Sequence, residues 1–147
     1  NNAAVIINHT SDLPNLMQSK TKYKNLIKDI KTDLKNKVRT SIKMGINPHS
    51  IVIDPGIGFG KTVKQNITLI KKAEEFSKLK LPVMYGVSNK SFLGEILKIK
   101  IPKNRTNASV VAACFCLNNG ANLLRVHNIK ETREMIKIWQ ELENVRN

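Results

Sequence analysis

The sequence is short of aromatic residues, cysteines and long apolar runs, and each shortage excludes a class of protein. Aromatic residues make up 5% of the 147 residues, which is too few for a platform on which nucleic-acid bases stack. No apolar run approaches the ~20 residues of a membrane-spanning helix. Cys114 and Cys116 lie two positions apart in an apolar helical stretch, so they point to different helix faces and cannot easily bridge. We expect two small buried side chains in a reducing, cytoplasmic compartment.

The N-terminal residues also lack the features of a secreted protein. They have neither the basic start nor the cleavage site of a signal peptide. An initial Met is missing as well, and the chain opens almost directly on an apolar run. We therefore expect residues 1–147 to be a piece of a longer chain.

Acidic residues are scarce, with 11 Asp and Glu against 25 Lys and Arg, which gives a net charge of +14. The hydrophobic share of 41% suits one modest globular unit rather than a disordered chain. The positive surplus alone is typical of a nucleic-acid binder. However, most lysines, as in "SKTKYKNLIKDIKTDLKNK", interleave with apolar residues at helical spacing and so indicate solvated helix faces. We expect no nucleic-acid partner, and the positive field would help an anionic substrate to arrive.

The stretch "IVIDPGIGFGKT" at 51–62 ends like a nucleotide-binding P-loop but lacks its spacing. A P-loop has four residues between its first glycine and the closing Gly-Lys-Ser/Thr, so that successive backbone N–H groups wrap a phosphate. Here the first position is Pro55, which has no N–H, and starting from Gly56 leaves the loop one residue short. The alternating glycines of this loop also fail the dinucleotide-binding pattern. Lys61 is therefore not a P-loop lysine, and the sequence leaves open whether it faces solvent.

Short apolar runs alternate with amphipathic stretches along the chain. The apolar runs, which we predict to be strands, cover 3–9, 51–54, 81–88 and 122–127. The amphipathic or helical stretches cover 20–44, 64–78, 91–98, 107–119 and 130–143. This order implies parallel strands with helical crossovers. The strands are apolar at consecutive positions, so we expect both of their faces to be buried.

Each apolar run stops at polar or ionisable residues. These are Asn8 and His9, then Asp54, then Ser88, Asn89 and Lys90, and finally Arg125 and His127. A (β/α)8 barrel builds its active site at the C-terminal ends of its strands, whereas an open doubly wound sheet places ligands mainly at one switch point. We therefore favour an α/β fold, a (β/α)8 TIM barrel. A whole barrel takes ~250 residues, so this chain would cover about the last four βα units, with two unpaired edges and a partly open apolar interior.

Three successive motifs resemble the signatures of the dihydropteroate synthase family: "IVIDPGIGFGKT", then "YGVSNKS", then "LLRVH". The opening "INHTSDLPNLMQ" is similar to that family's fifth-strand segment, which ends in Pro-x-x-Met-Gln. The resemblance runs over nearly the whole chain, in order and with fitting spacing. It implies that residues 1–147 are the C-terminal half of a pterin-binding TIM-barrel domain, strands five to eight.

The resemblance implies a folate-pathway transferase that joins a pterin pyrophosphate ester to p-aminobenzoate and releases dihydropteroate and pyrophosphate. Its cofactor would be Mg²⁺, which assists the departure of pyrophosphate, and sulfonamides would target it. Its partners would be these small molecules, with a homodimer and a fusion to another folate-pathway enzyme left open. We expect no metal ligands in this half, since its histidines share no ligand-like spacing. We also expect residues 1–147 alone to be inactive, because half of the barrel's loops would be missing.

The resemblance also assigns roles to the strand-end residues. Asp54 would accept the amino group and ring N–H of a pterin in a fork, and Lys90 would donate to the pterin carbonyl and a ring nitrogen. The planar Arg125 would stack on the ring and, with His127, clamp the pyrophosphate. The predicted pterin-binding residues are Asp54, Gly58, Phe59, Gly86, Lys90 and Arg125. The predicted p-aminobenzoate-binding residues are Ser88, Phe59 and Gly58, and the predicted pyrophosphate-binding residues are Arg125 and His127. The predicted catalytic residues are Lys90, Arg125 and His127.

Several of these residues also have a purely structural interpretation, which the sequence leaves open. Asp54 would then only cap the turn that follows it. Lys90 would be an exposed lysine at the start of a helix, and His127 would be a histidine of the core.

The sequence departs from the family pattern at three positions. Thr10 stands where members usually have Met, so we expect Asn8 and His9 to contribute less to the pterin site. Asn89 replaces the usual Arg and removes a cation beside the site. Asn128 replaces the usual Asp and removes an acceptor. The last two changes leave room for reduced activity.

Two other functions remain as alternatives. A pterin-binding methyltransferase resembles this barrel and also holds a pterin with an Asp, but it would need neither Lys90 nor the pair of Arg125 and His127. A non-catalytic basic binding module rests on the net charge of +14.

Overall fold

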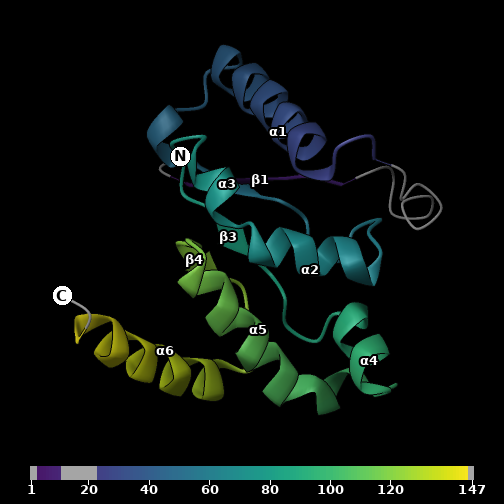
Figure 1. The fold of residues 1–147 in the computed structure, drawn as a ribbon. Helices are drawn as coiled ribbons and strands as arrows, with labels where there is room; N and C mark the ends of the chain where they lie inside the picture. Colours follow the sequence, from purple (N-terminus) through teal and green to yellow (C-terminus); the bar gives the residue numbers. More distant parts are fainter. Residues whose placement is uncertain (1–2, 11–22, 146–147) are drawn as a thin grey trace.

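A computed structural model describes residues 3–10 and 23–145, in which strands and helices alternate (Figure 1). The strands are β1 (Val5–Asn8), β2 (Ile51–Asp54), β3 (Met84–Tyr85) and β4 (Leu123–Leu124). The helices are α1 (Leu26–Lys43), α2 (Val63–Lys71), α3 (Glu74–Ser77), α4 (Ser91–Leu97), α5 (Thr106–Asn118) and α6 (Ile129–Asn144). Two short 3-10 helices, η1 (Pro48–Ser50) and η2 (Pro102–Arg105), precede β2 and α5. Within the described ranges, no helix combines the length and the apolar character needed to cross a membrane.

All four strands are parallel and follow one another in chain order. β1 pairs with β2 in a register that sets Ile7 beside Ile53 and Asn8 beside Asp54. A parallel bridge between Ile53 and Val83 continues the sheet to β3, and β3 pairs with β4. A doubly wound sheet reverses its strand order at a switch point. The unreversed order seen here is that of a segment of barrel wall.

One face of this wall packs against the helices and the other is partly open. Ile53 and Val83 are fully buried, and the Tyr85 hydroxyl donates to a main-chain oxygen of α2 at 3.0 Å. Side chains alternate between the faces of a strand, and Ile6 and Leu123 on the opposite face are 48% and 41% exposed. The prediction that the strands are buried on both faces is therefore wrong at Ile6 and Leu123, where none of the described residues covers the inner face. The predicted open apolar interior is confirmed.

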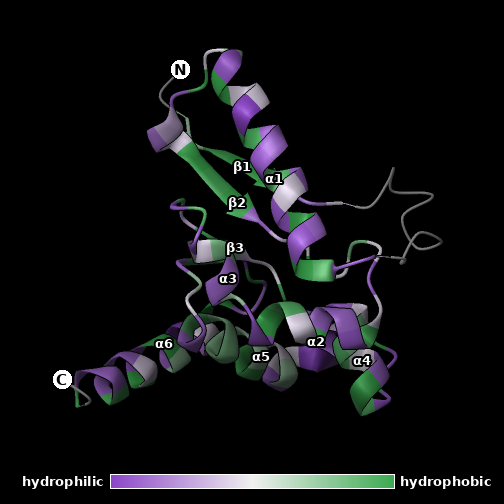
Figure 2. Ribbon diagram, turned by 45° about the horizontal axis from the view of Figure 1, so that its top comes forward, coloured by the Kyte–Doolittle hydropathy of each residue, from purple (hydrophilic) through white to green (hydrophobic). Residues whose placement is uncertain are grey.

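The core lies between the wall and the helices. Figure 2 shows hydrophobic residues along β1 and β2 and mainly hydrophilic ones along the visible side of α1. The largest fully buried side chains include Tyr85, Phe76, Ile30, Leu34 and Leu69. Burying a side chain of this size contributes about 1.5–3 kcal/mol. The core therefore anchors α1, α2 and α3 to the strands that carry the site.

The two cysteines are both unbridged, as expected. Cys116 is fully buried in the core, whereas Cys114 is only half-buried. The prediction of two buried side chains is correct for Cys116 alone, because residues two positions apart on a helix face different directions.

Local side-chain caps fix where the first long helices begin. The Asn25 side chain accepts the N–H of Lys28 at 3.1 Å at the start of α1. Thr62 and Gln65 form a reciprocal capping box at the start of α2. Such caps satisfy backbone N–H groups that have no partner within the helix. The capping box matters for the site because it ends the glycine loop that follows β2.

The helix predicted over 64–78 is broken in the structure. α2 ends at Lys71, and α3 is a separate short helix. The Ser77 hydroxyl of α3 donates to the main-chain oxygen of Gly120 at 3.2 Å. The break thus lets α3 pack against the loop before β4, a tertiary contact that helical periodicity does not reveal.

The strands are shorter than predicted at three places. The run at 3–9 forms Val5–Asn8, and the runs at 81–88 and 122–127 form strands of two residues each. Beyond each of the two-residue strands the chain turns to line the pocket described below. The family-like Pro-x-x-Met-Gln segment at 14–18 and the start of the helix predicted from 20 lie outside the described residues.

Candidate active site

The ends of β2, β3 and β4 meet at one pocket of about 400 Å³. Its lining residues are Asp54, Phe59, Gly86, Ser88, Asn89, Lys90, Pro102, Arg125 and His127. The structure therefore brings together every residue assigned from the sequence except Gly58. That glycine lies directly behind the lining, because a Cβ added to it would come within 2.9 Å of Cδ of Lys90. Larger hollows occur on the outer helical surface, but this pocket is where ionisable groups converge.

Strand register explains why these residues converge. Asp54 points to the face opposite Ile53, toward the interior of the barrel wall. Gly86 and Arg125 follow β3 and β4 by the same alternation, and the Arg125 N–H still bonds to Tyr85 at 2.9 Å. Three neighbouring strand ends thus place the Asp54 carboxylate, the Gly86 main chain and the Arg125 guanidinium on one side of the sheet.

The Asp54 carboxylate is 6% exposed and is oriented by the turn that follows it. Its Oδ1 accepts the N–H of Gly56 at 2.7 Å, so the turn-capping interpretation is correct for one oxygen. Among the described residues, the carboxylate has no second hydrogen-bond donor, which leaves Oδ2 for a ligand. Burial raises the pKa of Asp54, and the Gly56 bond and the nearby Lys90 ammonium oppose that rise.

Lys90 lines the same pocket as Asp54 and is only half-buried. Its Nζ sits 4.1 Å from the centroid of the Phe59 ring, in a cation–π contact. Burial lowers the pKa of Lys90, while the Asp54 charge raises it and the Arg125 charge lowers it further. A freely solvated helix-start lysine would show neither the ring contact nor the shift, so that interpretation is wrong.

Ser88 and His127 join the ends of β3 and β4. The Ser88 side chain is buried, and its oxygen accepts the main-chain N–H of His127 at 3.3 Å. The same oxygen lies 3.1 Å from Nδ1 of the imidazole. His127 and Arg125 are both exposed at the pocket mouth, so the core-histidine interpretation of His127 is wrong.

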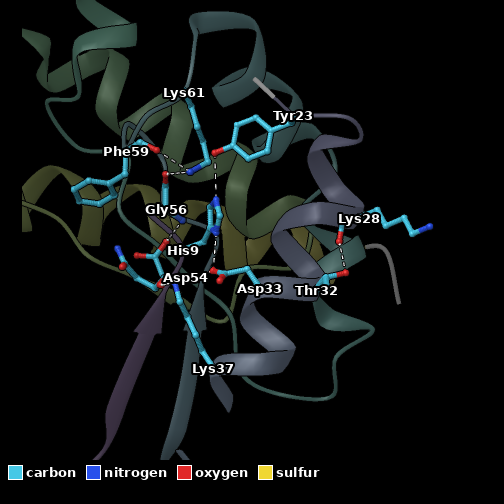
Figure 3. A network of polar contacts seen from close by, with 11 residues as sticks. His9, Tyr23, Lys28, Thr32, Asp33, Lys37, Asp54, Gly56, Phe59 and Lys61 are labelled. Carbon is cyan, nitrogen blue, oxygen red and sulfur yellow. Dashed lines mark hydrogen bonds and ion pairs between the residues drawn. The ribbon is translucent and has the colours of Figure 1, made fainter. Parts of the chain in front are cut away.

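His9 lies behind the pocket rather than in its lining. It is 7% exposed, with Nδ1 2.7 Å from Asp33 Oδ2 and Nε2 3.2 Å from the Tyr23 hydroxyl (Figure 3). Burial lowers the pKa of His9, although the hydrogen bond with Asp33 opposes this. The expectation that His9 contributes little to the pocket agrees with this placement. Its role is to join β1 to α1.

Lys61 is also buried, and the option that it faces solvent is wrong. The residue is 6% exposed, and its Nζ donates to the main-chain oxygens of Gly56 at 2.8 Å and Phe59 at 3.0 Å (Figure 3). A P-loop lysine reaches outward to phosphate, whereas this one turns back onto its own loop. Sequence reasoning missed this role, and its only signal was the lysine directly following three alternating glycines.

A family model described as pterin binding enzyme matches residues 1–127. The chain belongs to the pterin binding enzyme family. A dihydropteroate synthase from Synechocystis is 35% identical over 140 residues, which cover 95% of this chain and 48% of that protein. The sequence resemblance to that family is thus confirmed, and the chain spans about half the length of the curated relatives that it matches.

Solved structures of such enzymes superpose closely on this member of the pterin binding family. The Yersinia pestis dihydropteroate synthase, solved as a sulfonamide drug complex, gives a TM-score of 0.93 at 31% identity and covers 96% of this chain and 51% of its own. The Thermus thermophilus enzyme, solved in complex with 6HMPPP, gives 0.89 at 32% identity and covers 95% and 55%. The predicted fold, part of a TIM barrel, is confirmed.

Asn89 is held in an unusual backbone conformation in this pterin binding family member. Its φ of +59° is left-handed, a region that Asn tolerates better than most residues. Its N–H donates to the Ser109 hydroxyl at 2.9 Å, and its carbonyl accepts Nη1 of Arg105 at 2.8 Å. Although position 89 carries no cation, the buried Arg105 guanidinium therefore lies against its backbone. Nothing in the local sequence marked Arg105 or Ser109 for this role.

The third departure, Asn128, uses its side chain as a donor. Its Nδ2 donates to the Thr106 hydroxyl at 3.1 Å, which ties the start of α6 to the start of α5. Its Oδ1 is buried without a hydrogen-bond partner among the described residues. An Asp at this position has no N–H to give, so the substitution changes which groups join the two helices.

Proposed function

We propose that the natural full-length chain that carries these residues is a dihydropteroate synthase. It would condense 6-hydroxymethyl-7,8-dihydropterin pyrophosphate with p-aminobenzoate and release 7,8-dihydropteroate and pyrophosphate. The observation that carries this proposal is the single pocket in which the buried Asp54 faces Lys90, Arg125 and His127. The family supports the same reaction, since the relatives named above are dihydropteroate synthases.

Asp54 and Lys90 would bind the pterin ring. The free Oδ2 of Asp54 provides an acceptor, and Oδ1 adds a second acceptor beside it, so that a fork of two N–H donors fits the carboxylate. Lys90 would donate from the other side of the pocket. Gly86 lines the same pocket without a side chain, so a flat ring could lie against its backbone beside Arg125.

Arg125 and His127 would hold the pyrophosphate. Both are exposed at the mouth, directly ahead of α6, whose N-terminus favours anions. As the carbon–oxygen bond of the ester ionises, negative charge grows on the departing oxygens. The guanidinium and the imidazole would stabilise that charge where it develops. Meanwhile Asp54 and Lys90 would hold the ring in line for attack by the aryl amine.

Phe59, Gly58 and Ser88 would form the p-aminobenzoate side. The Phe59 ring supplies an apolar wall, and Gly58 lets the backbone come close. The Ser88 oxygen already accepts the His127 N–H, which leaves its own proton to donate to Nδ1 or to a ligand carboxylate. Relatives support p-aminobenzoate as the second substrate, because the Thermus enzyme was solved with 4-aminobenzoate and the Yersinia enzyme with a sulfonamide drug. Sulfonamides would bind here.

Mg²⁺ is proposed only as a companion of the pyrophosphate, whose hard oxygens suit it. Among the described residues, no group of three His, Cys, Asp or Glu side chains gathers as metal ligands. The residues at hand therefore do not fit a resident metal site, and no step above is assigned to the ion.

The surface and the cysteines support two further proposals, on the assembly and the location of the protein. Val111 and Phe115 on α5 are 58% and 60% exposed, and together with Ile67 they form an apolar outer patch beside a hollow. We propose a homodimer through this patch, since exposed apolar patches mark interfaces, and a cytoplasmic location fits the unbridged cysteines. A fusion to another folate-pathway enzyme stays an expectation from the resemblance.

The two alternatives are weaker on this geometry. A pterin-binding methyltransferase has no use for the cationic mouth formed by Arg125 and His127. A basic binding module has no use for a buried carboxylate at the centre of a pocket. Its lysines also lie largely on exposed helix faces, as predicted, rather than in one groove.

The deciding experiment measures pyrophosphate release by the natural full-length chain with the pterin pyrophosphate ester, with and without p-aminobenzoate. We expect release that depends on p-aminobenzoate and forms dihydropteroate. Methyl transfer from a methylated pterin, with no pyrophosphate release, would establish the methyltransferase instead. A salt-dependent gel shift with nucleic acid and no turnover would establish the binding module.

A further inference from the structure

Lys61 is a buried cation without an adjacent counter-ion. It is 6% exposed, and no carboxylate among the described residues lies within ion-pair distance of its Nζ. Lysines are almost never buried to this extent unless paired. Burying an ammonium costs free energy, so its position needs a structural explanation that the pocket residues do not provide.

The bonds of Lys61 supply that explanation. Nζ donates to the carbonyl of Gly56 at 2.8 Å and to that of Phe59 at 3.0 Å, so it joins both ends of a tight turn. The Phe59 N–H also reaches the Gly56 carbonyl, at 3.2 Å. The turn is thus closed once by its own backbone and a second time by the ammonium (Figure 3).

Gly56 connects this closure to the pocket. Its carbonyl is held by Lys61, while its N–H donates to Oδ1 of Asp54 at 2.7 Å. No other residue fits here without strain, because the φ of Gly56 is +75° and an added Cβ would lie 1.8 Å from the main-chain oxygen of His9. A change in the turn therefore reorients the Asp54 carboxylate on one side and the Phe59 ring on the other.

We propose that Lys61 is a positioning residue that fixes the turn from Gly56 to Phe59, and thereby sets the orientation of the Asp54 carboxylate and the Phe59 ring for the pterin and the aryl amine. The inference about the ligands rests on the proposed function, whereas the inference about the turn does not. Lys61 itself touches no pocket space, since it is not among the lining residues.

The charges around Lys61 agree with this role. Burial lowers its pKa to about 7, Asp54 raises it and Lys37 lowers it. The charged and titratable groups that face it from β1, α1, β2 and the loop before α4 are His9, Asp33, Lys37, Asp54 and Lys90. A neutral amine keeps two N–H donors, so both carbonyl bonds survive deprotonation and the turn stays closed on either side of neutral pH.

The test compares three forms of the natural full-length chain: wild type, Lys61→Met and the matched control Lys64→Met. Lys64 is exposed on α2, three residues along the chain, so its substitution removes a charge without opening the turn. The first readout is amide hydrogen exchange in the absence of ligand. We expect Lys61→Met to speed exchange at Gly56 and Phe59 by about tenfold, the factor of ~1.4 kcal/mol, with no change in α6, whereas Lys64→Met leaves both regions as in wild type.

The second readout separates positioning from general loss of structure. We expect Lys61→Met to weaken binding of the unesterified pterin and to raise KM for p-aminobenzoate, each by about tenfold, while the affinity for free pyrophosphate stays the same. The Lys61→Gln amide also has two N–H donors, so this variant should recover part of the pterin affinity and reverse part of the rise in KM for p-aminobenzoate. If Lys61→Met does not fold, Lys61→Gln takes its place in both measurements.

Each outcome decides the matter. Unchanged exchange at Gly56 and Phe59 overturns the role of Lys61 in the turn. Faster exchange with unchanged ligand affinities overturns the role of Lys61 in positioning the pocket residues. Equal losses of affinity for pterin, p-aminobenzoate and pyrophosphate would mean that Lys61 only stabilises the fold. If wild type binds no pterin at all, the proposed function fails, and the exchange data still decide whether Lys61 fixes the turn.

Discussion

Nζ of Lys90 lies over the face of the Phe59 ring, 4.1 Å from its centroid. The two residues come from different loops, one after β3 and one after β2, so the contact fixes the distance between neighbouring strand ends. Cation–π pairs of this kind contribute about 0.5–2 kcal/mol. The contact therefore links two loops of the pocket through residues that would also touch substrate.

Phe59→Leu tests that contact, because Leu keeps apolar bulk and removes the aromatic face. We expect KM for p-aminobenzoate to rise about 2- to 30-fold, the range that the contact energy corresponds to, with a smaller change in pterin affinity. Steady-state kinetics with each substrate varied in turn provides the measurement. A larger effect on the pterin than on p-aminobenzoate would show that the ring has been assigned to the wrong substrate.

Asp54→Asn should keep the shape of the pocket and lose the charged fork. The expected cost to pterin binding is about 1.5–3 kcal/mol, the range for hydrogen bonds to charged groups. The Asn oxygen still accepts the Gly56 N–H, so the turn itself should stay intact. Calorimetry with the unesterified pterin measures the loss, and an unchanged affinity would remove Asp54 from the site.

Arg125→Ala and His127→Ala should act on the other half of the substrate. Each variant should weaken binding of the pyrophosphate ester far more than binding of the pterin alcohol, because both side chains are exposed at the pocket mouth, whereas Asp54 is buried. Competition binding with the two ligands makes the comparison. Equal losses for ester and alcohol would count against a pyrophosphate clamp.

Lys61 should make stability depend on pH in a defined window. Burial lowers its pKa from 10.5 to about 7 in the folded protein. Between these values the unfolded chain binds a proton that the folded chain does not, so the contribution of Lys61 to the free energy of unfolding rises with pH. Urea unfolding of wild type and Lys61→Met at about pH 7 and about pH 10 checks this. A stability difference that stays constant between the two pH values refutes the shift.

Residues 1–147 alone should not turn over substrate. A barrel enzyme draws catalytic groups from strand ends around the full ring, and a misplacement of about an ångström can cost ~100-fold in rate. An assay of dihydropteroate formation by these residues, beside the natural full-length chain, gives the answer. Comparable rates from the two, with the shorter chain monomeric, would mean that four strand ends suffice.

The sequence predicted those parts of the site that depend on where strands stop. Asp54, Ser88 and Arg125 each follow an apolar run, and the rule that parallel strands share one C-terminal edge was enough to place them in one pocket. The fold was predicted from the alternation of strands and helices and from these strand ends. That alternation is present in the structure even where a strand is only two residues long.

Other parts depend on contacts between distant segments, and the sequence carries no local mark of them. Arg105 and Asn89 meet across 16 positions, and Ser77 reaches Gly120 across 43. Lys61 was ambiguous for a different reason: a lysine after a glycine loop fits an outward and an inward side chain equally well. Only the packing of His9 against Gly56 and the position of the two carbonyls decide for the inward one.

The half-exposed inner face of the sheet has a consequence for how such a barrel can be divided. Ile6 and Leu123 mark an apolar strip bounded by β1 and β4, each of which has one edge that no described strand pairs with. That strip and its two edges would match the corresponding surface of four further βα units, whether they lie on the same polypeptide or on another. A barrel divided at these edges would therefore keep Asp54, Arg125 and His127 together in this half, and the exposed edges of two separately made halves would pair with each other.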